Sequence, residues 1–223
     1  MKTLEQLLDA ESSWPVIQQL LKKSPLACEV VEAPDEERAL TLVGLQVTVH
    51  SFLGALAWGC GVIAIDHGWV RLLGAGVGTL DGLHVETLDD VAGSRSFEGI
   101  VAAVDILGGR FAVHGGGLAE VALGDVVYFA PDTLEWMPTG LGHSGLVEFL
   151  LSDRLATFYA DLRWVGWEGD VQGVPLDHGL AAYPFPWTQE GRGPGVSRRA
   201  VPFAELIGFA EDAAAQLRGA GSG

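Results

Sequence analysis

Residues 99–129, GIVAAVDILGGRFAVHGGGLAEVALGDVVYF, decide the fold. Three apolar runs alternate there with two glycine-rich turns, in the order 99–104, 108–109, 111–114, 115–117 and 126–129. Apolar runs of this length between turn residues are typical of β-strands. Because such short connections cannot contain the crossover that parallel strands need, the segment predicts an antiparallel meander.

Apolar runs punctuated by glycine continue upstream. Residues 56–58, 62–65 and 69–73 predict further strands. The link Asp66-His67-Gly68 contains the residue types of a tight reversal, so the second and third of these runs are expected to form a hairpin. Residues 74–95 are polar and irregular, which predicts a loop with a short helix.

Helices are predicted on both sides of these strands. At the N-terminus, Thr3 can cap a helix that begins at Leu4, Ser13 can cap a second from Trp14, and Pro34 opens an acidic first turn of a third. Two helices should follow the meander and cover the sheet. Their ranges are 144–151 and 155–162.

The C-terminal third differs in composition. Residues 164–199 are rich in Gly, Pro and aromatic side chains and predict an extended, irregular wrap on the core, followed by a helix over 202–217. The chain is thus expected to form a single α+β domain with a central antiparallel sheet. Its parts are a helical region at 1–50, a sheet core with covering helices at 51–165, the wrap and final helix at 166–218, and a tail at 219–223.

Composition limits the classes of partner. The chain has 223 residues, 48% of them hydrophobic and 19% charged, which is typical of a folded globular domain. The formal net charge of -16 disfavours binding to nucleic acid or to an anionic membrane. The same charge would attract a basic protein, although acidity also simply keeps a protein in solution.

Cysteine usage and the first residues indicate a cytoplasmic protein. Cys28 and Cys60 form no CxxC pair, and no Cys/His cluster has zinc-site spacing, so we expect a reducing compartment, no metal and no cofactor. Residues 1–5 lack the basic start of a signal peptide, and the apolar stretch 53–65 is too short to span a bilayer.

Local motifs for catalysis are weak, which predicts a protein that is not an enzyme. Asp66-His67 could orient an imidazole for general base chemistry, but adjacent turn residues rarely face each other. His114 precedes three glycines as in an esterase oxyanion loop, yet the chain has no GxSxG nucleophile motif. The glycines at 74–78 lack the spacing of a dinucleotide-binding loop.

Seven tryptophans form the other notable pattern. Trp164, Trp167 and Trp187 fall in the predicted wrap, where they could form a binding platform because they offer a large contact area at low entropic cost. The alternative is that they anchor the wrap to the core.

Two resemblances to families follow from these residues. The strand ending in Asp105, the Gly108-Gly109 turn, and the run VVYFAPDTLEW at 126–136 resemble the central pattern of the SUKH superfamily. The runs IDHGW at 65–69, YFAPDTL at 128–134 and YPFPWT at 183–188 resemble a bacterial family known only as a domain of unknown function. The SUKH resemblance implies an α+β domain that serves as an immunity protein against toxins or as a scaffold, and it implies no catalytic residues.

The leading hypothesis is therefore a non-enzymatic protein-binding module of immunity-protein type, with a basic toxin domain as partner. The candidate binding residues are Asp66, His67, Trp69, Asp105, Tyr128, Asp132, Trp136, Trp164, Trp167 and Trp187. A rival hypothesis is a small-molecule-binding protein or enzyme, with a pocket near Asp66, His67 and His114; it requires these three groups to converge. A third is a homo-oligomer that pairs through an exposed sheet edge.

Overall fold

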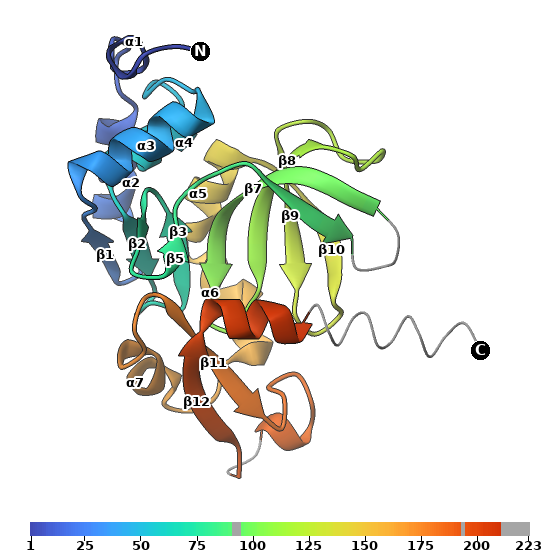
Figure 1. Cartoon of the computed structure of the whole chain (residues 1–223). Coiled ribbons are helices and arrows are strands. Elements are labelled where there is room, and N and C mark those ends of the chain that lie inside the picture. Colours follow the sequence, from blue (N-terminus) through green and yellow to red (C-terminus); the bar gives the residue numbers. More distant parts are fainter. Residues whose placement is uncertain (91–94, 193–194, 211–223) are drawn as a thin grey trace.

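The computed structural model describes residues 1–90, 95–192 and 195–210 (Figure 1). Its helices are α1 (Leu4–Leu8), α2 (Trp14–Lys23), α3 (Asp35–Leu45), α4 (Phe52–Gly59), α5 (His143–Leu150), α6 (Arg154–Phe158), α7 (Trp167–Gln172), and the short 3-10 turns η1 (Ala160–Leu162) and η2 (Glu190–Arg192). Residues 203–210 form a further helix.

The strands belong to one large sheet and two small ones. The large sheet has the order β1 (Cys28–Val31), β2 (Val62–Ile65), β3 (Val70–Leu73), β7 (Arg95–Asp105), β8 (Arg110–Gly116), β9 (Asp125–Ala130) and β10 (Glu135–Gly142), with β6 (Glu86–Asp90) paired to β7. The small sheets are β4 (Gly76–Val77) with β5 (Leu80–Asp81), and β11 (His178–Tyr183) with β12 (Ser197–Pro202).

The fold is α+β around an antiparallel sheet, as the sequence predicts. Strands β7, β8 and β9 form the expected meander, with every described pairing antiparallel. The β2–β3 hairpin also forms, and Asp66 and His67 occupy its turn with φ of 53° and 59°. Gly68 follows with a φ of 86°, so three consecutive left-handed residues reverse the chain within the four-residue loop between the paired residues Ile65 and Val70.

Three sequence-based expectations are wrong. Residues 56–58 lie in α4, which Ser51 caps, and not in a strand. The prediction failed because a short, continuous apolar run has no period that distinguishes a helix from a strand. Residues 74–90 hold β4, β5 and β6 in place of the predicted loop with a short helix, and residues 91–94 of that prediction lie outside the described residues. The C-terminal wrap is not irregular, since it contains α7 and the β11–β12 hairpin.

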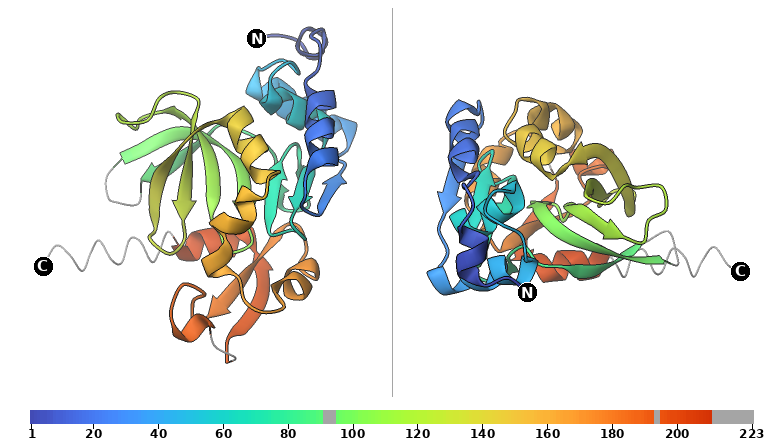
Figure 2. Two further views of the ribbon diagram at one scale, coloured as in Figure 1. Left: turned by 180° about the vertical axis from the view of Figure 1, so that it is seen from behind. Right: turned by 90° about the horizontal axis from the view of Figure 1, so that it is seen from above.

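Helices cover both faces of the large sheet. Figure 2 shows α5 and α6 on one face and the helix at 203–210 on the other, while α1–α4 pack beside β1–β3. The predicted helices that begin at Leu4, Trp14 and Asp35 all form. The β11–β12 hairpin and α7 lie beyond one end of the sheet (Figure 1).

One row of residues crosses the large sheet on the face beneath the helix at 203–210. Directly paired residues of antiparallel strands point to the same face, so the register defines the row. Its members, from β1 to β10, are Glu29, Ala64, Arg71, Val104, Arg110, Phe129 and Trp136. We call this set the cross-strand row.

The two edges of the large sheet differ. β1 is a four-residue strand whose outer side pairs with no other strand of the described residues, and Val30 on it is partly exposed. β10 is longer, but it contains Pro138 and its register shifts between Pro138 and Leu141. A proline and a bulge both interrupt the ladder of donors that an edge strand presents.

The first residue of α5 should make stability depend on pH. Burial lowers the pKa of His143 to about 4, and its Nε2 is buried without a hydrogen-bond partner among the described residues. The unfolded chain binds a proton near pH 6.5, whereas the folded chain does not until about pH 4, so the free energy of unfolding should fall as pH drops through this window, by up to about 1.4 kcal/mol per unit.

Urea denaturation of His143→Leu and the parent protein between pH 7 and pH 4 measures this effect. The difference between the two proteins should change with pH over this window. A constant difference would contradict the prediction.

Candidate functional site

Asp105 lies at the end of β7 and is the most strongly hydrogen-bonded carboxylate of the core. It is 1% exposed. Its Oδ1 accepts hydrogen bonds from the backbone N–H groups of Leu107 and Gly109, both at 2.9 Å, inside the β7–β8 turn. Its Oδ2 accepts from the hydroxyls of Tyr128 at 2.8 Å and Tyr159 at 3.0 Å.

This arrangement ties a turn to two separate elements. Burial raises the pKa of Asp105, and the four hydrogen bonds oppose that shift because they favour the carboxylate. Gly109 permits the approach, since a Cβ at that position would lie 2.0 Å from Oδ2 of Asp105. The tyrosines come from β9 and from the segment after α6, so Asp105 joins the turn to the helical cover.

The β2–β3 turn carries a second polar group beside the tryptophans. Oδ2 of Asp66 lies 2.5 Å from a guanidinium nitrogen of Arg163, and both side chains are nearly buried. The Arg163 guanidinium also stacks on aromatic rings, at 4.1 Å from the centroid of Trp167 and 5.0 Å from that of Trp69. Trp69 in turn contacts Trp164, with ring centroids 5.7 Å apart.

These tryptophans anchor the C-terminal part of the chain to the core. Trp69 is fully buried, and Trp164 stacks on Arg198 of β12 at 4.0 Å from its guanidinium. Trp164 also donates a hydrogen bond from Nε1 to Asp170 at 2.7 Å. The geometry therefore supports the anchoring role for Trp164 and Trp167 that the sequence left open.

His114 is not near Asp66 and His67. It pairs with Gly99 on β7, six residues from Asp105, which is about 20 Å along a strand. Its Nε2 accepts a hydrogen bond from the backbone N–H of Leu118 at 3.1 Å, and Nδ1 lies 3.2 Å from the carbonyl oxygen of Ala122. The structure thus holds His114 in a loop contact and does not bring the three groups of the rival hypothesis together.

A cavity lies between β11–β12, the helix at 203–210 and the turn after β9. Its volume is about 680 Å³. Ala181, Arg199 and Val201, which share one face of the hairpin, form one side. Phe185 and Trp187 stack in parallel on another side, with ring centroids 4.8 Å apart and an angle of 5° between the planes. We call this the C-terminal cavity.

Charged groups lie only at the rim of the C-terminal cavity. Asp132, Arg199 and Glu205 line it, and all three are exposed. Solvated charges of this kind lack the desolvation that tunes catalytic acids and bases. Away from this rim the cavity is lined mainly by apolar and aromatic side chains.

Comparison with known proteins identifies the family. A family model described as "Protein of unknown function DUF2625" matches residues 4–206. The chain belongs to the DUF2625 family. The uncharacterized protein YbfG of Escherichia coli strain K12 is 36% identical over 211 residues, covering 92% of this chain and 94% of the relative. An uncharacterized protein of Haemophilus influenzae is 28% identical over 178 residues, covering 77% of each chain.

Membership of DUF2625 confirms the resemblance to a bacterial domain of unknown function. No solved structure matches the chain. The resemblance of its core to the SUKH superfamily stays a prediction.

The ten candidate binding residues of this DUF2625 protein fall into four places. Asp66, His67, Trp69, Trp164 and Trp167 gather around Arg163, and Asp105 bonds Tyr128. Asp132 and Trp187 line the C-terminal cavity. Trp136 lies on β10 against Phe97, with ring centroids 5.2 Å apart. They do not form one surface.

Sequence reasoning missed Tyr159 and Arg163, which complete two of these places, and it also missed the buried Arg71. Tyr159 and Arg163 come from the segment after α6. Their partners, Asp105 and Asp66, lie far away along the chain, and no local sequence pattern indicates such distant pairs. Arg71 did leave a signal, because a charged residue interrupts the buried run VRLL.

Two features are absent from the described ranges. No group of three His, Cys, Asp or Glu side chains there is placed to hold a metal ion. Within the same ranges, no helix has the length and apolar character needed to cross a membrane.

Proposed function

We propose that this DUF2625 protein is a non-enzymatic binding protein that takes a small, flat apolar molecule in the C-terminal cavity. The observation that carries the proposal is the cavity itself, with its volume of about 680 Å³ and its stacked Phe185–Trp187 pair. Sites for organic ligands usually measure about 300–1,000 Å³ and are lined mainly by apolar and aromatic side chains. A planar molecule would extend the existing ring stack.

The hairpin supplies a rigid side for the ligand. Ala181 pairs with Arg199, so both side chains point to the same face of β11–β12, and the small methyl group of Ala181 leaves room above that face. Ala200 is paired with Leu180 and points to the opposite face. The two alanines therefore offer a matched pair of positions for a test.

N-phenyl-1-naphthylamine, a neutral apolar dye that becomes fluorescent in apolar surroundings, is a suitable probe. We expect saturable binding with one dye per chain and energy transfer from Trp187. Ala181→Trp should weaken binding at least about tenfold, because the indole fills the space that the dye needs, which is a loss of about 1.4 kcal/mol.

Ala200→Trp is the control, since it adds the same side chain to the same hairpin on the other face and should bind the dye like the parent. The proposal fails if the parent protein shows no saturable binding. It also fails if Ala181→Trp binds as tightly as Ala200→Trp.

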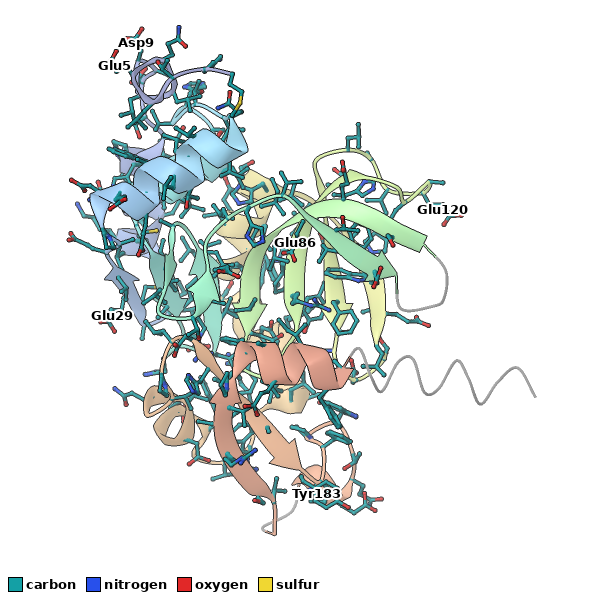
Figure 3. All side chains as sticks on the ribbon, in the orientation of Figure 1. Glu5, Asp9, Glu29, Glu86, Glu120 and Tyr183 are labelled. Carbon is teal, nitrogen blue, oxygen red and sulfur yellow. The ribbon has the colours of Figure 1, made fainter. Side chains whose placement is uncertain are left out.

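A second candidate function is the protein-binding module of immunity type, and one observation favours it. Tyr183 is 74% exposed and Phe209 is 58% exposed, and both lie at the C-terminal cavity. Figure 3 shows Tyr183 at the far end of the hairpin, away from the core. Exposed aromatic rings beside an apolar cavity are common at protein interfaces.

The partner in that case would be a basic toxin domain, in keeping with the net charge of -16. Pull-down with the products of neighbouring genes and growth rescue against toxins among them test this candidate. Rescue that is lost in a Tyr183→Ser, Phe209→Ser variant would support it. If neither the pull-down nor the rescue gives a signal, the candidate is excluded.

A further inference from the structure

Arg71, the third residue of the cross-strand row, is the one described arginine whose three guanidinium nitrogens are all buried and without a hydrogen-bond partner among the described residues. Its side chain is fully buried. The Phe203 ring covers it, with the guanidinium carbon 5.3 Å from the ring centroid. A buried guanidinium normally pairs with a carboxylate or a phosphate, because leaving its donors unpaired costs several kcal/mol.

The nearest opposite charge does not satisfy these donors. Burial lowers the pKa of Arg71 to about 10, and the charge of Asp105 opposes this shift. Asp105, however, points to the other face of the sheet, because it is paired with Val70, and its oxygens accept from two backbone amides and two tyrosines. Arg71 thus remains a cation inside the protein with five unused donors.

A second cavity lies on the same face of the sheet as Arg71, over β1 and β2. Its volume is about 320 Å³. Glu29 and Ala64 of the cross-strand row line it, and Val171, Val174 and Leu176 form an apolar side. Arg71 itself is not among the residues that line this cavity. Ala64 is paired directly with Arg71, so the Cβ atoms of the two residues lie about 5 Å apart, and a ligand in the cavity reaches the buried guanidinium by displacing the side chains between them.

The charges along the row define the ligand. Arg71 offers an inner cation, and the small Ala64 separates it from Glu29 at the outer edge of β1, where Figure 3 labels that carboxylate. The negative Glu29 at the mouth would repel a dianion such as phosphate more than a monoanion. The apolar side favours a ligand with an apolar body.

We propose that Arg71 is the anion-binding residue of a second site, reached through the β1–β2 cavity, that takes a small monocarboxylate with an apolar body. The carboxylate accepts two parallel hydrogen bonds from the guanidinium, a geometry that suits arginine. The apolar body of the ligand contacts Val171, Val174 and Leu176. This site lies apart from the C-terminal cavity and does not depend on the function proposed for it.

Isothermal titration with benzoate, and with the uncharged benzamide, tests the site. We expect benzoate to bind with one molecule per chain, and benzamide to bind at least about tenfold more weakly, since the uncharged amide cannot form the charge-assisted pair of hydrogen bonds with the guanidinium. Arg71→Met should lose benzoate binding by a similar factor. This variant should fold, because a methionine of similar volume removes a buried unpaired charge.

Three further measurements make the result specific. Val174→Trp keeps Arg71 but fills the cavity, so this variant should lose benzoate binding. It tests the site even if the Arg71→Met protein does not fold. Arg199→Met removes a positive charge at the C-terminal cavity and should bind benzoate like the parent. Inorganic phosphate should bind less tightly than benzoate.

Several results would overturn the proposal. These are the absence of benzoate binding to the parent protein, equal affinity for benzoate and benzamide, and unchanged benzoate binding in Val174→Trp or in a folded Arg71→Met protein. Loss of binding in Arg199→Met would place the carboxylate at the C-terminal cavity instead. Tighter binding of phosphate would contradict the assigned ligand class.

Discussion

Asp105→Ala is expected to lower the free energy of unfolding by about 3–5 kcal/mol, because it leaves several buried donors without an acceptor. The donors are the backbone N–H groups of Leu107 and Gly109 and the hydroxyls of Tyr128 and Tyr159. The loss is larger than for an ordinary polar-to-alanine change because one carboxylate serves two turn amides and two separate elements.

Urea denaturation measures this loss as a lower midpoint. Tyr159→Phe is the matched control, since it removes one hydrogen bond and keeps the ring, and should cost only about 1 kcal/mol. Asp105→Asn should fall between the two, because the amide oxygen can still accept from the turn. A loss below about 1 kcal/mol for Asp105→Ala would show that the network contributes little to stability.

Arg163→Met should cost about 3–5 kcal/mol, because it leaves the Asp66 carboxylate nearly buried and without its cation. The variant also removes the stacking of the guanidinium on Trp69 and Trp167. The tryptophan contacts that hold the C-terminal part on the core would loosen with it.

A double-mutant cycle with Asp66→Asn isolates the charge pair. Asparagine tolerates the positive φ of 53° at position 66, so this variant preserves the turn while it removes the charge. The double variant should be more stable than Arg163→Met alone, because no unpaired carboxylate remains. Additive effects of the two changes would mean that Asp66 and Arg163 are not coupled in the folded state.

The fold was predictable from sequence where the turn residues and the apolar runs on either side of them indicate the same strand pairing. The Asp66-His67-Gly68 turn and the glycine turns of the meander specify their conformations through residues close in sequence. The prediction of a strand failed at α4. Ser51 provided a capping signal for a helix there, but the residues of the run 56–58 are all apolar and show no helical period. It failed again at β6, whose residues ETLDD contain too few apolar side chains for a clear alternation.

The candidate sites were predictable only in part, because their partners meet through tertiary packing. Asp105 and Tyr128 belonged to one recognisable pattern, yet the second tyrosine joins them from 54 residues away. The arginine beside Asp66 is 97 residues distant. The C-terminal cavity could not be foreseen, since it exists only where the hairpin, the helix at 203–210 and the turn after β9 come together.

The unequal edges of the large sheet bear on how this protein behaves when it is crowded. Strand-by-strand stacking of many copies into fibrils requires a long, regular edge with free donors and acceptors. On β10, Pro138 and the shift in register deny such a template, and β1 ends after four residues. Neither edge of the folded sheet therefore offers the template for such stacking, and we expect fibril formation to require unfolding that frees the central strands.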